Sequence, residues 1–309
     1  MPGRELWLFR CRFVMRHTEQ AGRCKSTSDV RMGVREGISL ARKTDLFARY
    51  GGAALVTGAS SGLGEAFAKR LARGGFDVVL AARRRERMER IALAIRKSSK
   101  ARCVIFETDL AAPGSVEALF QRIAEEKLDI GLIVNNAGFG TFRELRLCNV
   151  DEQLAMTDLN CRAVLEIAHR GCQLLAERQR GAMIITSSVL GHFSLPRMAT
   201  YSATKAFDLS LAEALWAEMH QFGVDVQALC PGPTDTEFHT RAGSPTRTGL
   251  RSMTCAEVVD ISLRRLGRGP VVIPGFRNRL LVGGLRAMPA SIRMRLLALA
   301  SRVGKNRAA

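Results

Sequence analysis

The sequence predicts an α/β fold in which one doubly wound parallel sheet is covered by helices on both faces. From about residue 50, short runs rich in Val, Ile and Ala alternate with longer amphipathic stretches, a pattern typical of repeated strand–helix–strand units. A glycine-rich turn follows the first of these runs, Ala53–Thr57, and a helical pattern then extends through Leu71. Both features are typical of parallel sheets that bind a nucleotide.

The remaining elements follow in the same alternation. Further strands are expected at residues 78–82, 103–107, 132–134, 183–186, 224–229 and 271–273. Helices are expected between them at residues 85–97, 115–126, 151–179 and 200–220. No second break in composition interrupts this series, so we expect a single domain over residues 50–275.

The charge of the chain is concentrated at its two ends. Of the formal net charge of +18, residues 1–50 contribute +6, residues 264–309 contribute +11, and the body contributes +1. A nearly neutral body disfavours a nucleic-acid-binding function, which requires a basic face on a recognisable binding element. No run of about 18 apolar residues occurs, so no transmembrane helix is predicted.

Residues 1–49 are predicted to be a basic and poorly ordered extension, and Met15 and Met32 are alternative starts of the mature protein. The eight cysteines are scattered without metal-ligand spacing. This usage favours reduced thiols in the cytoplasm over disulfides, and predicts that the protein holds no metal.

The glycine-rich turn reads T-G-A-S-S-G-L-G over residues 57–64. Alone, it is compatible with any tight loop. Between a strand and a helix, its glycines let the backbone approach a pyrophosphate at the helix N-terminus, which predicts a Rossmann-type dinucleotide site.

The end of the second predicted strand indicates which dinucleotide binds. Ala81 and Ala82 stand where an NAD site carries a carboxylate, and Arg83 follows them. A guanidinium suits a ribose 2′-phosphate, so NADP(H) is favoured over NAD(H). Arg84 and Arg85 are expected to face water. The alternative is that the whole arginine run is solvated at the start of a helix.

Ser188, Tyr201 and Lys205 are the candidates for proton chemistry. Tyr201 and Lys205 are one helical turn apart and leave the same helix face. An ammonium nearby stabilises a phenolate and lowers its pKa, which makes the tyrosine a general acid and base for a carbonyl oxygen.

These residues resemble the short-chain dehydrogenase/reductase family over about residues 50–275. The turn at 57–64, Asp109-Leu110, Asn135–Gly138, Asn160, the Ser188 to Tyr201 spacing of 13 residues, Y-x-x-x-K and Pro231-Gly232 match the family's motifs in order. The resemblance implies hydride transfer between a nicotinamide and a carbonyl or alcohol carbon. It also implies four catalytic residues, Asn160, Ser188, Tyr201 and Lys205.

The family's roles map onto this sequence as expectations. Tyr201 exchanges the oxygen-bound proton, Lys205 holds the nicotinamide ribose, Ser188 stabilises the substrate oxygen, and Asn160 supports a water-linked relay from Lys205. The cofactor is expected to contact Gly58, Ser60, Ser61, Gly62, Leu63, Gly64, Arg83, Asp109, Leu110, Asn136, Ala137, Gly138, Tyr201, Lys205, Pro231, Gly232, Thr234 and Thr236.

The sequence therefore predicts an NADP(H)-dependent oxidoreductase acting on a carbonyl or secondary alcohol, with a lipid-like or acyl-chain ketone as candidate substrate. An alternative from another class is a non-catalytic NADP(H)-binding sensor or membrane-surface protein. A homodimer or homotetramer is expected, as is common in the family.

Residues 276–309 are predicted to form a basic amphipathic tail. Ile292, Leu296, Leu299 and Val303 repeat along one helical face. Such a helix either lies on an anionic membrane surface or packs on the domain or on a partner, and the sequence leaves both open.

Overall fold

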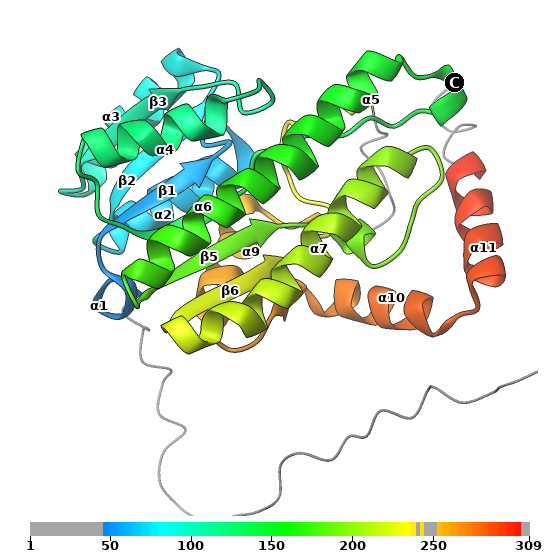
Figure 1. The fold of residues 1–309 in the computed structure, drawn as a ribbon. Helices are drawn as coiled ribbons and strands as arrows, with labels where there is room; N and C mark the ends of the chain where they lie inside the picture. The colour runs from blue at the N-terminus through cyan, green and yellow to red at the C-terminus, as the bar shows by residue number, and fades with distance from the viewer. Residues whose placement is uncertain (1–45, 239–241, 244–251, 304–309) are drawn as a thin grey trace, which may run out of the picture. The chain divides into compact units, whose positions relative to one another are not determined.

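The structure, a computed structural model, describes residues 46–238, 242–243 and 252–303, with the side chains of 301–303 excepted. Its centre is a parallel sheet of seven strands in the order β3-β2-β1-β4-β5-β6-β7 (Figure 1). The strands are β1 (Ala53–Thr57), β2 (Asp77–Ala82), β3 (Cys103–Glu107), β4 (Ile130–Asn135), β5 (Gly181–Thr186), β6 (Val224–Leu229) and β7 (Val271–Val272). The predicted doubly wound fold is confirmed.

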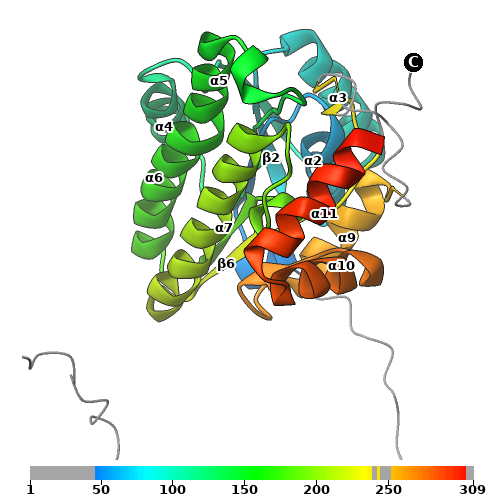
Figure 2. The same cartoon turned by 90° about the vertical axis from the view of Figure 1, so that its right-hand side faces the viewer.

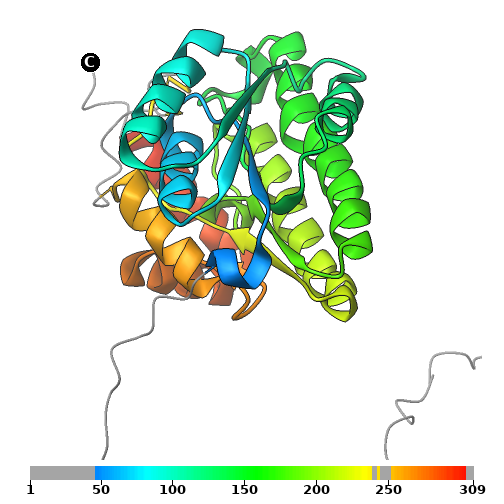
Figure 3. The same ribbon diagram turned by 90° about the vertical axis from the view of Figure 1, so that its left-hand side faces the viewer.

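Helices cover both faces of this sheet (Figures 1 and 3). On one face lie α2 (Gly62–Arg73), α3 (Arg85–Ser98) and α9 (Cys255–Arg265). On the other lie α4 (Ser115–Glu125), α6 (Ala163–Glu177) and α7 (Ala199–Met219). The helix α9 is absent from the sequence prediction.

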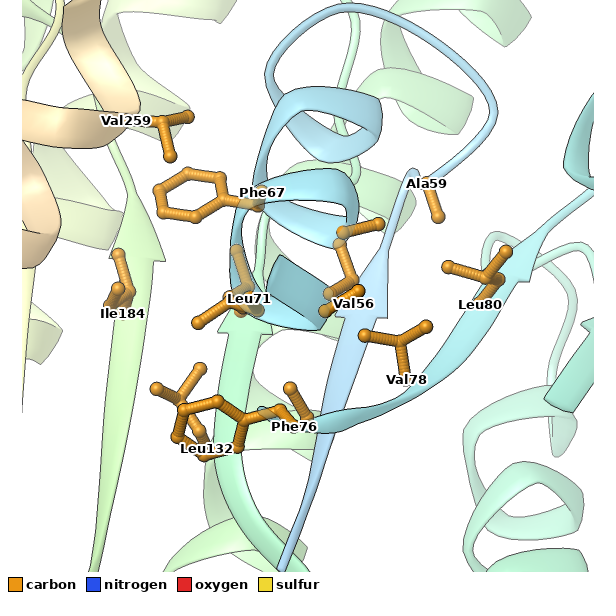
Figure 4. Packing of buried hydrophobic residues seen from close by; sticks show 14 of the residues in the cluster. Val56, Ala59, Phe67, Leu71, Phe76, Val78, Leu80, Leu132, Ile184 and Val259 are labelled. Carbon is orange, nitrogen blue, oxygen red and sulfur yellow. The ribbon is translucent and has the colours of Figure 1, made fainter. Parts of the chain in front are cut away.

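Each central strand is buried on both faces, which is why the strands read as continuous apolar runs. Along β1, Val56 points toward α2 and α9, whereas Leu55 packs with the helices of the opposite face. Figure 4 shows Val56, Phe67 of α2 and Val259 of α9 in the first of these two cores.

The helix predicted over 151–179 is interrupted. The chain forms α5 (Val150–Thr157), a π-helical turn (η2, Asp158–Arg162) and then α6. A π turn inserts one extra residue into a helix and is frequent at functional sites. Here it contains the predicted catalytic residue Asn160.

The described structure starts inside the segment predicted to be an extension. Helix α1 (Leu46–Tyr50) anchors the chain: Phe47 contacts Phe76 edge-on, with ring centroids 5.3 Å apart. Arg49 pairs with Asp225 at 2.6 Å, and the buried Tyr50 hydroxyl donates to the same carboxylate at 2.8 Å. The remaining prediction for residues 1–45 lies outside the described residues.

The C-terminal segment forms two helices, α10 (Phe276–Ala287) and α11 (Ala290–Val303), which meet at a corner and run in different directions along one side of the domain (Figures 1 and 2). Val282 and Leu285 of α10 are buried against Val189 and Phe193, and Leu297 of α11 packs on the same cluster. The segment is therefore part of the domain's packing, and only its second helix is in the sequence prediction.

The predicted apolar face of α11 points outward. Ile292, Leu296 and Leu299 are 50%, 47% and 59% exposed, while the Val303 side chain lies outside the described residues. Within the described part of the chain, no helix combines the length and the apolar character that crossing a membrane requires.

Gly131, near the amino end of the central strand β4, provides a test of how tightly the chain packs there. A Cβ there would collide with the backbone oxygens of Gly51 and Tyr50. Overpacking against backbone costs about 2–3 kcal/mol, so Gly131→Ala should lower the free energy of unfolding by that amount in denaturant titrations. Gly283→Ala on the exposed side of α10, where nothing lies within 4 Å, is the control. It should be neutral or stabilise by up to about 1 kcal/mol, and equal effects of the two variants would contradict the assignment.

Candidate active site

A cavity of about 800 Å³ lies at the carboxyl ends of the central strands. Such a position, where the strand order reverses between β1 and β4, is where ligands bind in open α/β sheets. All of the predicted site residues except Gly64 and Asn160 line this one cavity. The sequence motifs are therefore brought together in space.

The glycine-rich turn forms one end of the cavity and leaves its backbone open to a ligand. Gly58 and Gly62 have φ values of +65° and +58°, in the left-handed region that favours glycine. A Cβ on Gly58 would sit 3.0 Å from the Cα of Ala137, and one on Gly64 would collide with the Gly58 oxygen. Gly64 thus serves helix–strand packing behind the turn.

Side-chain hydrogen bonds fix this turn to the end of β4. The Thr57 hydroxyl accepts from the backbone N–H groups of Asn136 and Ala137, at 2.9 and 3.0 Å. The Asn136 amide donates to the Thr57 carbonyl at 3.1 Å. The two loops that border the nucleotide end are therefore held as a unit, and this close glycine cradle fits a pyrophosphate.

Arg84 contacts the glycine-rich turn directly, although the sequence analysis assigned this region to Arg83. Its guanidinium donates to the hydroxyls of Ser60 at 2.9 Å and Ser61 at 2.7 Å, and pairs with Glu237 at 3.1 Å. The Arg83 side chain is 63% exposed and approaches Asp109 only to 3.9 Å. The expectation that Arg84 faces water is wrong, because the serine hydroxyls of the turn hold it; Arg85 pairs with Glu89 at the surface.

Tyr201 and Lys205 occupy the middle of the cavity, on the first turns of α7. Both are buried, and the Lys205 ammonium lies 5.8 Å from the centroid of the Tyr201 ring. The ammonium donates to the Thr186 carbonyl at 2.9 Å and to Asp208 at 2.8 Å. Ser188, at the end of β5, lines the same region.

Burial raises the pKa of Tyr201, and this effect outweighs the lowering by the Lys205 ammonium and by a hydrogen bond with Ser188. The sequence analysis expected a lowered pKa for Tyr201; it identified the effect of the Lys205 ammonium but left out the larger effect of desolvation. Burial alone would lower the pKa of Lys205, yet Asp208 and Tyr201 leave it raised. At neutral pH, the arrangement therefore holds a protonated phenol beside an ammonium.

Asn160 lies behind the cavity wall and organises it. Its amide donates to the Phe139 carbonyl at 2.9 Å and to the Thr204 hydroxyl at 3.1 Å, and its oxygen accepts from the Phe139 N–H at 3.1 Å. A Cβ on Gly138 would lie 3.0 Å from the Asn160 oxygen and 3.5 Å from the Lys205 nitrogen. The Asn160 relay role remains a prediction.

The segment after β6 closes the other side of the cavity through Pro231, Gly232, Thr234 and Thr236. The Thr234 hydroxyl donates to the Gly232 carbonyl at 2.9 Å, whereas the Thr236 hydroxyl accepts from the Phe238 N–H at 3.2 Å. The Thr236 hydroxyl thus keeps its own proton to donate to a ligand.

Asn278 fixes α10 to this corner. Its buried amide donates to Pro274 at 2.7 Å and lies so close to Gly232 that a Cβ there would meet it at 2.5 Å.

The far end of the cavity is apolar. It is lined by Phe142, Leu190, Phe193, Leu195, Met198, Phe238, Leu281, Leu285 and Leu297. The last three come from α10 and α11, so the segment predicted to be a tail supplies a wall of the site.

Asp208, Glu237 and Asn278 are polar contacts of the site that sequence reasoning missed. Asp208 had a visible signal, because it follows Lys205 by three residues on the same helix. Within the described residues, no group of three or more His, Cys, Asp or Glu is placed to hold a metal ion.

Comparisons with known proteins agree with this geometry. Residues 52–246 match the family model of the short chain dehydrogenases. A 7beta-hydroxysteroid dehydrogenase of Collinsella aerofaciens is 32% identical over 235 residues, 75% of this chain and 89% of that protein.

Two solved structures extend the similarity to the fold. A 7beta-hydroxysteroid dehydrogenase superposes with a TM-score of 0.75 at 30% identity and covers 82% of this chain and 99% of its own. A short-chain dehydrogenase from Sphingobium yanoikuyae in complex with NADPH gives 0.69 at 33% identity, over 75% and 93% of the two chains. The chain belongs to the short-chain dehydrogenase/reductase family and is an NAD(P)-dependent oxidoreductase that acts on CH–OH and C=O groups.

Proposed function

We propose that the protein is an NADP(H)-dependent reductase of a bulky, apolar, lipid-like ketone, or a dehydrogenase of the matching secondary alcohol. The observation that supports this most directly is the single cavity that joins the phosphate cradle, Tyr201 and an apolar end. Nine apolar side chains at that end offer little to a small polar substrate. Relatives named 7beta-hydroxysteroid dehydrogenase point to the same size and polarity of substrate.

In this proposal the nicotinamide supplies or accepts the hydride, and the protein handles the proton and the charge. Tyr201 donates its phenolic proton to the carbonyl oxygen, and Ser188 donates a hydrogen bond to the same oxygen. Lys205 holds the ribose hydroxyls and stabilises the phenolate that remains. Asn160 keeps the Phe139 loop in place and supports return of the proton from solvent.

The preference for NADP(H) rests on both arginines after β2. Arg84 is already fixed over Ser60 and Ser61, and Arg83 lies beside the same cavity, exposed and 3.9 Å from Asp109. A 2′-phosphate between them would replace the contact of Arg84 with Glu237.

We also propose that exposed apolar residues of the α5–α6 and α7 surfaces join copies into a dimer or tetramer. Leu154, Leu165, Phe207 and Trp216 are between 36% and 57% exposed on these helices. Apolar groups of this size at a surface are typical of protein–protein contacts.

The outer faces of α10 and α11 are proposed to contact an anionic membrane surface from the cytoplasm. Phe276 and Leu280 on α10, and Ile292, Leu296 and Leu299 on α11, are exposed. The segment from residue 264 to the end holds eleven basic and no acidic residues, a charge that complements anionic lipid.

Tyr201→Phe separates an enzyme from a protein that only senses NADP(H). Because the variant lacks only the phenolic hydroxyl and with it the exchangeable proton, we expect NADPH oxidation on a ketone panel graded by size to fall by about 10²–10⁴-fold. The affinity for NADPH, measured by fluorescence, should stay near that of the wild type. Turnover of any panel member at the wild-type rate by Tyr201→Phe would contradict the assigned role.

Arg84→Ala and Arg83→Ala test the cofactor preference. Loss of a charge-assisted contact to a phosphate should weaken the binding of NADPH by about 10–100-fold. NADH lacks that phosphate, so its dissociation constant should change much less. The surface variant Arg85→Ala is the control, and equal losses for the two cofactors would refute the preference.

The membrane contact is tested by flotation with vesicles. The protein should float with phosphatidylserine-containing vesicles and less so with pure phosphatidylcholine or at high salt. Ile292→Asp with Leu296→Asp should reduce binding at least about tenfold, because it removes two apolar groups from the lipid contact. Leu93→Asp, at an exposed position of α3, should leave binding unchanged. Unchanged flotation of the double variant would exclude this face as the contact.

A further inference from the structure

A buried carboxylate stands directly beside the catalytic lysine. Asp208 lies three residues after Lys205 on α7 and is 0% exposed. Its Oδ2 atom is 2.8 Å from the Lys205 ammonium, and its Oδ1 atom has no hydrogen-bond partner among the described residues. This carboxylate is a further charge in an active site already containing the Tyr201 hydroxyl and the Lys205 ammonium.

Placing a carboxylate here is costly. Removing an ion from water costs several kcal/mol even after the protein relaxes, and a buried pair often contributes nothing net to stability. An apolar residue would fill a helix position facing the core more cheaply. The position of Asp208 therefore calls for an explanation other than stability.

We propose that Asp208 is a positioning residue that fixes the Lys205 ammonium and offsets part of its positive charge at Tyr201. This inference rests on the proposed role of Tyr201 as the proton donor. It adds a residue to that site which neither the family motifs nor the comparisons assign.

The hydrogen bonds of the ammonium carry the first half of the proposal. A lysine ammonium has three N–H groups. One donates to the Thr186 carbonyl and one to Asp208, at 2.9 and 2.8 Å. One is left for the cavity, which Lys205 lines. Two fixed contacts on the protein side hold this third donor in a single direction toward a ribose.

The second part of the proposal, that Asp208 offsets positive charge at Tyr201, rests on the other titratable groups around the pair. Cys161 of η2 and Cys230 after β6 face the pair from the neighbouring elements, and burial raises their pKa values to about 11 and about 12. Both thiols are thus neutral at physiological pH. Glu213, also on α7, is exposed and its field is screened by water. Burial raises the pKa of Asp208 itself, and the Lys205 ammonium opposes this.

A negative charge at Asp208 makes Tyr201 and Lys205 bind their protons more tightly. Tyr201 and Lys205 are close enough to titrate as a coupled pair. Whichever of the two loses its proton first, removing a nearby negative charge lowers the pH at which that proton leaves. Asp208 thus strengthens the hold of Tyr201 on the proton that the phenol donates when a carbonyl is reduced.

The chain allows this to be measured without any substrate. It contains only two tyrosines, Tyr50 and Tyr201. Burial and the Asp225 carboxylate raise the pKa of Tyr50 far above its usual range. The near-ultraviolet phenolate absorbance of the folded protein in an alkaline titration therefore reports Tyr201 alone.

In the full-length protein, Asp208→Asn should move this titration midpoint down by about one pH unit, the size expected for one charge at this range in a protein interior. Asp208→Val, a second neutral variant, should shift it in the same direction, and Asp208→Glu should restore a midpoint near that of the wild type. Glu213→Gln removes the same charge from an exposed site of the same helix and should leave the midpoint in place. Tyr201→Phe should remove the signal.

Coincident midpoints for wild type and both neutral variants would overturn the proposal, since they would mean that Asp208 carries no charge. An upward shift would overturn it as well. An unfolded variant is recognised because both tyrosines then titrate together with twice the amplitude, and the comparison then rests on the other neutral variant. The titration needs no turnover, so it fails or succeeds independently of the substrate proposed above.

Discussion

The structure depends on one constraint: where the strand order of the parallel sheet reverses, the backbone N–H and C=O groups at the carboxyl ends of two neighbouring strands need hydrogen-bond partners. The chain leaves β1 for α2 on one face of the sheet and leaves β4 toward α6 on the other, so the turn at 57–64 and the loop after Asn135 meet between these two strands. Thr57 bridges the two by accepting from Asn136 and Ala137. The hydrogen bonds that shape the expected cofactor cradle are thus the same ones that join the ends of β1 and β4. For this reason, replacing the glycines of the turn would disturb the fold as well as the cradle.

The sequence predicted what depends on local pattern and fixed spacing. All seven strands and the ordered motifs were recoverable, because buried parallel strands read as apolar runs and the turn needs glycine at set positions. The helices α9 and α10 were not. Helix α10 is arginine-rich with two adjacent glycines, and it is held by the close approach of Asn278 to Gly232 and by burial of Val282 and Leu285. Such tertiary support leaves little periodicity to detect.

The same reasoning explains the error at Arg84. Neighbouring arginines are indistinguishable in sequence, and only the path of the chain into α3 decides which one folds back over Ser60 and Ser61. The apolar repeat in α11 was read correctly as one face, yet Leu297 on another side is the residue that packs into the domain. A periodic apolar face shows that a helix is amphipathic, and it does not show which partner that face meets.

The C-terminal helices connect the two ends of the site. Asn278 fixes α10 against Gly232, where the segment around Thr234 and Thr236 borders the cofactor region. One or two turns further along, Leu281 and Leu285 line the apolar end. Any change in how α10 seats on the domain therefore alters the substrate wall and the cofactor corner together. For that reason we expect the substrate selectivity to depend on α10 and α11 as much as on the proposed catalytic residues, although the family's motifs all lie outside these helices.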